Sequence, residues 1–141
     1  MKRTALLFII ILLTFVSIAQ NNVPDKYFKL CNQGDSLFKK NEYSSAAIVY
    51  SKAFVANDRQ GRVKDRYSAA CCRAMFNNSD SAFFQLYRIA TKGMYTDYEK
   101  VLEEPNFISL HEDKRWIALI DIMKKRRDEI EEAIQQLQPG L

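Results

Sequence analysis

The feature that most limits the fold of this chain is the spacing of its apolar residues, which follows the period of an α-helix from residue 24 to residue 137. No segment shows the two-residue alternation that is typical of a half-buried strand. Short asparagine-containing breaks and one longer polar loop, residues 57–61, divide the pattern into segments. The sequence therefore predicts an all-α protein with helices over residues 24–40, 43–54, 63–76, 81–91, 97–103, 105–110 and 113–137.

Polar residues and prolines mark the ends of these helices. Pro24 favours a helix start because its missing N–H would have no partner in the first turn. Ser79 is the predicted N-cap of the fourth helix. Thr96 with Glu99 three residues later fits a capping box for the fifth. The pair at residues 139–140, Pro then Gly, is expected to end the last helix.

Two of the predicted helix pairs have the spacing of an internal repeat. Ala46 and Ala82 occupy matching places in the second helix of each pair and stand 36 residues apart. That separation is close to the roughly 34-residue period of one class of helix-pair repeat. Because small side chains let two helix backbones approach closely, we expect the helices to cross where Gly34 meets Ala46 and where Ala70 meets Ala82.

Two stretches of the chain are similar to those of a known family. Residues 67–72 and 77–83 read YSAACC and NNSDSAF, and the tail carries Gly93, YTDY at 95–98, EPNF at 104–107, LH at 110–111 and RW at 115–116. Over about residues 25–125 the sequence resembles exported bacterial tetratricopeptide repeat (TPR) proteins with a modified C-terminal unit. The resemblance implies a TPR-like α-solenoid of two helix-pair repeats with a C-terminal capping segment at residues 24–125, and it carries no catalytic residues.

The tail is expected to close the stack. Stacked helix pairs need a neighbour to cover each apolar face, so the apolar side of residues 81–91 would be exposed without a cap. We expect four large residues of the tail to cover it: Phe107, Trp116, Leu119 and Ile120. Residues 126–141 are then the end of the last helix and a tail.

The first 19 residues have the pattern of a secretory signal peptide. Lys2 and Arg3 precede an apolar run over residues 5–16, and Ser17-Ile18-Ala19 supplies the small residues of a cleavage site. The run from residue 5 to residue 19 would span about 22 Å as a helix, less than the roughly 30 Å of a bilayer core. We therefore expect cleavage near Ala19 and export to the periplasm or the extracellular space. A retained anchor is the alternative; after cleavage no stable membrane insertion is expected.

Charge and composition bear on the kind of partner. The net charge of +4 falls to +2 when Lys2 and Arg3 are removed, because 19 basic residues then face 17 acidic ones. That balance argues against nucleic acid as a partner. His111 is the only histidine, and the adjacent Cys71 and Cys72 lack the spacing of zinc ligands. We expect no cofactor, no metal and no enzymatic activity, and a protein or peptide as the partner.

The three cysteines leave three interpretations open. Cys31, Cys71 and Cys72 are first of all expected to be small buried apolar residues. A disulfide from Cys31 to one of the adjacent pair, or a reactive thiol, are the alternatives for an odd number of cysteines in an exported chain.

The inner face of the stack is the predicted binding site. The first helix of each pair lines the concave surface of a helix-pair solenoid, which suits the binding of a peptide or a helix. By helical register this groove is expected to be lined by Phe28, Cys31, Asp35, Phe38, Lys64, Tyr67, Cys71 and Met75. The alternative is that the tail folds back over part of this face.

The last helix supports a second hypothesis about function. Its basic run at residues 124–127 is followed by acidic residues, which is typical of a solvated face with pairs such as Arg127 with Glu131. An apolar stripe, Ile130, Ile134 and Leu137, continues beyond the predicted end of the stack. The sequence thus predicts an exported adaptor that binds a protein in its groove, with self-assembly or envelope docking through the last helix as the alternative.

Overall fold

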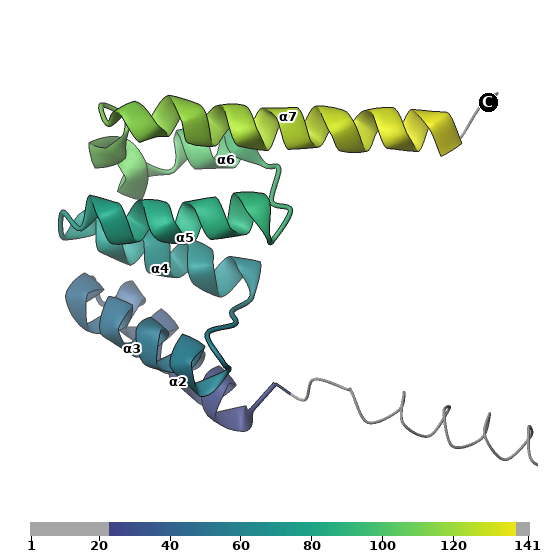
Figure 1. Cartoon of the computed structure of the whole chain (residues 1–141). Helices are drawn as coiled ribbons and strands as arrows, with labels where there is room; N and C mark the ends of the chain where they lie inside the picture. Colours follow the sequence, from purple (N-terminus) through teal and green to yellow (C-terminus); the bar gives the residue numbers. More distant parts are fainter. Residues whose placement is uncertain (1–22, 138–141) are drawn as a thin grey trace, which may run out of the picture.

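The computed structural model describes residues 23–137, and all of the regular structure within that range is helical (Figure 1). The elements are α2 (Asp25–Lys39), α3 (Tyr43–Ala56), α4 (Val63–Met75), α5 (Ser79–Thr91), α6 (Tyr98–Glu103), the 3-10 helix η1 (Pro105–Leu110) and α7 (Lys114–Leu137). The prediction of an all-α protein is confirmed, and each predicted helix lies within a few residues of an observed one.

The helices pack as neighbours in chain order. α2 packs on α3, α3 on α4 and α4 on α5, while η1 contacts α4 and α7 contacts α5 and α6. Asn41 and Asn77 sit in the tight turns within the two pairs with φ of 62° and 61°, a left-handed conformation that asparagine tolerates better than most residues. The result is a stack with the α2–α3 pair at one end and α7 at the other (Figure 1).

Two predicted caps are wrong by one residue. The N-cap of α5 is Asn78, whose side chain accepts a hydrogen bond from the backbone N–H of Ser81 at 3.2 Å, and Ser79 lies in the first turn. The N-cap of α6 is Asp97, which accepts from the N–H of Lys100 at 3.1 Å, rather than Thr96. In both places two neighbouring polar residues compete for one cap, and the winner is the one whose oxygen reaches the N–H three residues on.

The first pair has a core of its own. Tyr27 and Cys31 of α2 pack with Tyr50 and Phe54 of α3, and Cys72 of α4 closes this cluster. Gly34 is buried at the crossing of α2 and α3, where an added Cβ would lie 2.9 Å from ring carbons of Tyr50. The close crossing expected at Gly34 is therefore present, and the group that fills the space against it is the Tyr50 ring.

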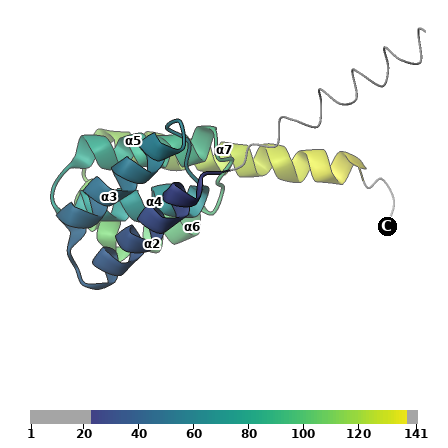
Figure 2. The same cartoon turned by 90° about the horizontal axis from the view of Figure 1, so that it is seen from below.

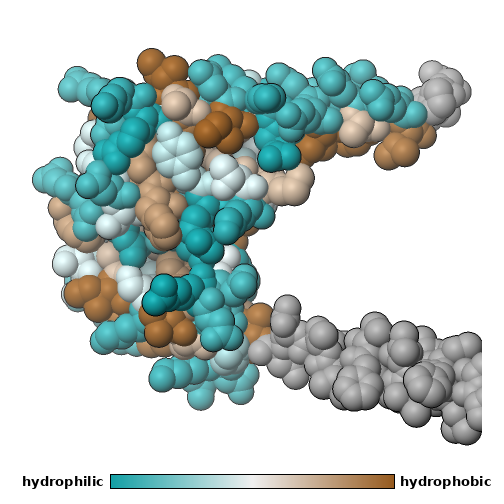
Figure 3. All heavy atoms as spheres, viewed as in Figure 1, coloured by the Kyte–Doolittle hydropathy of each residue, from teal (hydrophilic) through white to brown (hydrophobic). Residues whose placement is uncertain are grey.

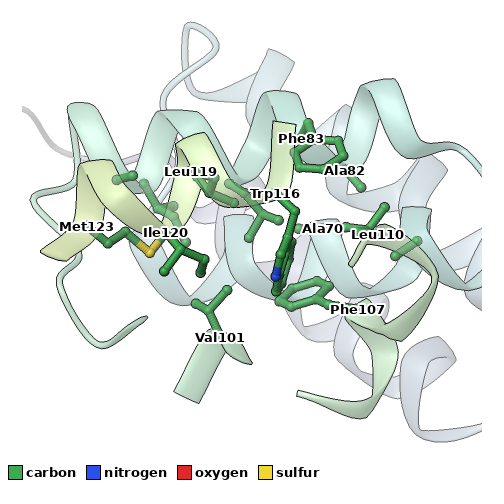
Figure 4. Close-up of a cluster of buried hydrophobic side chains, with 14 of the residues drawn as sticks. Ala70, Ala82, Phe83, Val101, Phe107, Leu110, Trp116, Leu119, Ile120 and Met123 are labelled. Atoms are coloured by element: carbon green, nitrogen blue, oxygen red, sulfur yellow. The ribbon is translucent and has the colours of Figure 1, made fainter. Parts of the chain in front are cut away.

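The second pair shares its core with the tail, as the sequence predicts. Phe83, Leu86 and Ile89 of α5 are buried in one cluster with residues that follow residue 100 (Figure 4). The tail contributes Val101, Phe107, Leu110, Trp116, Leu119, Ile120 and Met123. Trp116 packs its ring 6.2 Å from that of Phe107, so the expected core position of this tryptophan is confirmed.

All three cysteines are free and buried. Burial raises the pKa of the Cys31 thiol to about 11 and that of Cys72 to about 12, and it raises the pKa of Cys71 still further. The thiols are thus buried among apolar side chains, as expected of small apolar residues, and the structure contains no disulfide among them.

Two predictions fall on parts of the chain that lie outside the described residues: the signal peptide at residues 1–19 and the helix stop at residues 139–140. Among the helices of residues 23–137, none combines the length and the apolar character that crossing a bilayer requires.

Candidate docking surfaces

The inner face begins where α2 and α4 lie side by side. The Lys64 ammonium on α4 lies 3.8 Å from a carboxylate oxygen of Asp35 on α2, and the hydroxyl of Tyr50 donates to the same carboxylate. Phe28, half-buried on α2, lies under the guanidinium of Arg62, whose carbon is 5.0 Å from the ring centroid. This end of the face therefore offers one ion pair and one partly covered aromatic ring to solvent.

A buried network fixes these two helices against each other. Asp65, at the start of α4, has a fully buried side chain that accepts hydrogen bonds from the Tyr27 hydroxyl of α2 and from the guanidinium of Arg62, the latter at 2.7 Å. The Tyr27 hydroxyl in turn accepts from the backbone N–H of Arg62 at 2.9 Å. Burial and the neighbouring Asp65 carboxylate raise the pKa of Tyr27, so the phenol stays protonated and keeps donating.

The tail covers the other predicted part of the inner face. The Tyr67 ring lies 5.4 Å from that of Phe107 and 6.0 Å from that of Tyr95, and its hydroxyl donates to Glu104 at 3.1 Å. Lys100 places its ammonium 5.5 Å from the Tyr67 ring centroid. Burial, followed by the Glu104 charge, raises the pKa of Tyr67. Tyr67 thus packs against the tail and is not open to a ligand on the inner face.

The remaining predicted groove residues are divided between core and surface. Cys31 and Cys71 are buried in the two separate clusters, so neither thiol reaches the surface. Phe38 is half-buried with its ring 5.5 Å from that of Tyr43, and it packs against both clusters. Met75, at the end of α4, is 44% exposed. Of the eight predicted residues, the structure joins Asp35 and Lys64 directly, while Met75 belongs to the opposite end of α4 from Lys64.

An apolar groove lies at the end of the stack formed by α2 and α3. We call it the end groove: it lies between α2 and α3, has a volume of about 480 Å³ and is lined by Lys26, Leu30, Ile48, Ser51, Lys52, Val55 and Ala56. Ile48 and Val55 are 55% and 69% exposed, although both are large β-branched apolar residues. No acidic residue lines the groove, and two lysines do.

The sequence contained a signal for the end groove that the groove prediction did not use. α3 carries Ala46, Tyr50 and Ala53 on the side that packs in the core, and Ile48 and Val55 on another side. A helix that is apolar on more than one side is normally covered on more than one side. In the described part of the chain, α3 is covered by α2 and α4 and by no element beyond Ile48 and Val55.

The far end of α7 is the second apolar surface. Its buried residues end at Met123, and Arg127 is the last residue with a bond to another helix, donating to Glu99 at 2.7 Å and to the Tyr98 hydroxyl. Beyond it α7 projects past the other helices (Figures 1 and 2). Ile130 is half-buried, and Ile134 and Leu137 are 51% and 82% exposed. Apolar surface gathers along the underside of this projecting part (Figure 3).

Two buried arginines hold neighbouring helices together. Arg66 of α4 donates to the side-chain oxygen of Gln85 on α5 and to the carbonyl oxygen of Arg59, both at 2.7 Å. Arg73, also of α4, donates to the hydroxyl of Ser51 on α3 at 2.7 Å. Burial lowers the pKa of both arginines, and neutral oxygens satisfy their donors. Their geometry gives them a packing role between the helix pairs.

The groups that could carry chemistry are dispersed. His111 is exposed and stacks on Trp116 with ring centroids 4.4 Å apart, whereas the thiols of Cys71 and Cys72 are buried. Within residues 23–137, no three side chains of the metal-binding types gather closely enough to hold an ion.

Comparison of the chain with protein-family models, with curated proteins and with solved structures found no match in any of the three.

Proposed function

We propose that this protein is an exported, non-catalytic helical scaffold that binds another polypeptide, and that the end groove is its main docking site. The observation that carries the proposal is the exposure of Ile48 and Val55 along the α3 side of a hollow of about 480 Å³. Large exposed apolar residues that line a groove mark protein-interaction sites more often than scattered ones do.

The lining of the end groove favours an amphipathic helix of acidic character. Ile48 and Val55 are seven residues apart on α3, which is two helical turns or about 10 Å. A partner helix presents apolar residues at the same spacing when it lies along such a groove. Lys26 and Lys52 at the rim would attract carboxylates that flank the apolar stripe of the partner.

The scaffold itself is proposed to be TPR-like. The support is the succession of two helix pairs with matching small residues at Ala46 and Ala82, both of them buried. Export rests on the charged and apolar pattern of residues 1–19. The inner face remains a second docking surface in this proposal, restricted to its open end around Phe28, Asp35 and Lys64.

Site-specific photo-crosslinking in cells tests the proposal. A photoreactive residue at position 55 in the end groove is expected to capture a polypeptide through an acidic amphipathic segment, and Ile48→Glu in the same chain is expected to abolish the capture. A photoreactive residue at Ile108, which is equally exposed but far along the chain on η1, serves as the control. Capture from position 64 on the inner face, with none from position 55, would move the site to the inner face. Capture from neither position would reject the binding function.

A further inference from the structure

We propose that the occupant of the end groove is the projecting end of α7, residues 128–137, from a second copy of this chain. The inference rests on the proposed function for the location of the docking site and adds the identity of the partner. Neither the end groove nor the projecting end of α7 is covered in the described part of the chain. The inference also rests on the equal spacing of their apolar residues and on their opposite charge.

The apolar stripe of α7 continues from covered into uncovered helix. Trp116, Ile120 and Met123 face the core of the second pair. Ile130, Ile134 and Leu137 follow Met123 at steps of seven, four and three residues, so they stay on the same side of the helix. Beyond Arg127 that side has left the stack (Figure 1). An apolar stripe on a helix normally packs against another apolar surface, which removes it from water.

The two surfaces match in length. Ile130 and Leu137 span seven residues on α7, as Ile48 and Val55 do on α3, so each stripe is about 10 Å long. Three large apolar side chains on the helix therefore meet the three large ones of the groove, namely Leu30, Ile48 and Val55.

Their charges are opposite. Residues 128–137 contain four acidic side chains and no basic one. Glu129 and Glu131 each lie about 100° from Ile130 around the helix and so flank the stripe, while Asp128 and Glu132 lie on the far side. Both flanking carboxylates are partly exposed and lie 3.5 Å and 3.8 Å from the guanidinium groups of Arg126 and Arg127. The end groove carries Lys26 and Lys52 at its rim and no acidic residue. Opposite charges of this kind set the orientation of a docked helix.

A second copy is required because the two surfaces lie at opposite ends of one molecule. The α2–α3 pair and α7 are separated along the stack by α4 and α5 (Figure 1). Two copies that exchange this contact reciprocally form a closed isologous dimer, whereas a heterologous, head-to-tail contact continues into a ring or a filament.

Disulfide trapping between two variants tests the contact directly. Val55→Cys and Ile134→Cys are made in separate full-length chains, purified in the form in which the cell accumulates them, mixed and oxidised. The three native thiols are buried and serve as a silent background. We expect a disulfide between positions 55 and 134 at least tenfold enriched over that formed with Ile117→Cys, an α7 residue outside the stripe that is 67% exposed against 51% for Ile134. Equal yields from the two α7 positions would overturn the proposal.

Charge reversal supplies an independent test by sedimentation. Lys26→Glu with Lys52→Glu is expected to weaken self-association at least tenfold, and Glu129→Lys with Glu131→Lys in the other chain is expected to restore it in a mixture. Asp128→Lys with Glu132→Lys changes the net charge of α7 by the same amount on its far side and should restore nothing. Equal rescue by both α7 variants would contradict specific docking.

The failures of the two proposals are distinguishable. A protein that stays monomeric at all concentrations and gives no 55–134 disulfide overturns the second copy as the occupant. The end groove then remains a docking site for a different polypeptide only if two results hold. A photoreactive residue at position 55 must capture that polypeptide, and Ile48→Glu must abolish the capture.

Discussion

The two helix pairs of this protein, α2–α3 and α4–α5, are covered differently. Phe83, Leu86 and Ile89 of the second pair are buried because the tail packs across them. Ile48 and Val55 of the first pair are more than half exposed, because the end of the stack lies there in the described part of the chain. One chain thus contains a helix pair that the tail covers and another that no described element covers on its outer side.

The difference shows what a cap contributes. Helix pairs in a stack are stabilised mainly by their neighbours, so the terminal pair depends on its own internal packing. The first pair has such packing in the buried Tyr27 and Tyr50 and in the Asp65 network that ties it to α4. It can therefore keep an apolar groove open at its end, where a partner can reach it.

The largest expected effect comes from opening the cap. Trp116→Ala removes a buried ring from the cluster that joins the tail to α5, and truncations of this kind cost about 3–5 kcal/mol. Val55→Ala at the other end of the stack deletes methyl groups that are already in water, so a change within about 0.5 kcal/mol is expected. Urea unfolding of both variants, at a protein concentration at which sedimentation shows a monomer, measures the contrast. Similar losses would mean that Val55 is covered in solution.

Much of this fold could be predicted because its signals are local. Helical spacing, the asparagines at 41 and 77 and the proline at 105 lie within a few residues of the boundaries that they set. The caps at Asn78 and Asp97 were missed because adjacent polar residues offer nearly the same local chemistry. The residue that caps each helix is the one whose side-chain oxygen reaches the backbone N–H three residues later.

The candidate surfaces were harder to predict because they depend on contacts distant in sequence. Lys64 and Asp35 meet across 29 residues of chain, and helical register anticipated that they share a face. The cover over Tyr67 comes from Tyr95 and Phe107, whose packing no local pattern specifies. To predict the end groove, one must know that no other element packs on the outer side of α3. The apolar residues on that side suggest a cover, but the sequence does not say whether the chain itself supplies it.

A smaller effect is expected inside the uncovered pair. In Gly34→Ala the new Cβ would lie 2.9 Å from the ring of Tyr50, which is buried and held by its hydrogen bond to Asp35. Overpacking of a closed core costs about 1–3 kcal/mol, while the better helix propensity of alanine returns up to about 1 kcal/mol. We therefore expect a net loss of about 1–2 kcal/mol by chemical unfolding. In the double variant with Tyr50→Leu the two effects should be less than additive, and strict additivity would show that the ring can move aside.

The smallest effect per side chain is expected from alkaline pH, and it reports on both pairs because Cys31 and Cys72 lie in the first core and Cys71 in the second. Burial raises the pKa of Cys31 from 9.0 to about 11 and that of Cys72 to about 12. A thiol with a raised pKa binds its proton more tightly in the folded chain than in the unfolded one. Its contribution to stability is complete below pH 9 and is lost as the pH rises toward the folded value. The contribution of each thiol should therefore fall by about 1 kcal/mol between pH 9 and pH 10. Cys31→Ala should make the fall in stability smaller by about that amount, because the buried tyrosines whose pKa is also raised are the same in both chains. If Cys31→Ala leaves the slope of the free energy of unfolding against pH unchanged, the Cys31 thiol is accessible to solvent before global unfolding. The first pair would then not support itself, and the contrast with the capped pair would fail.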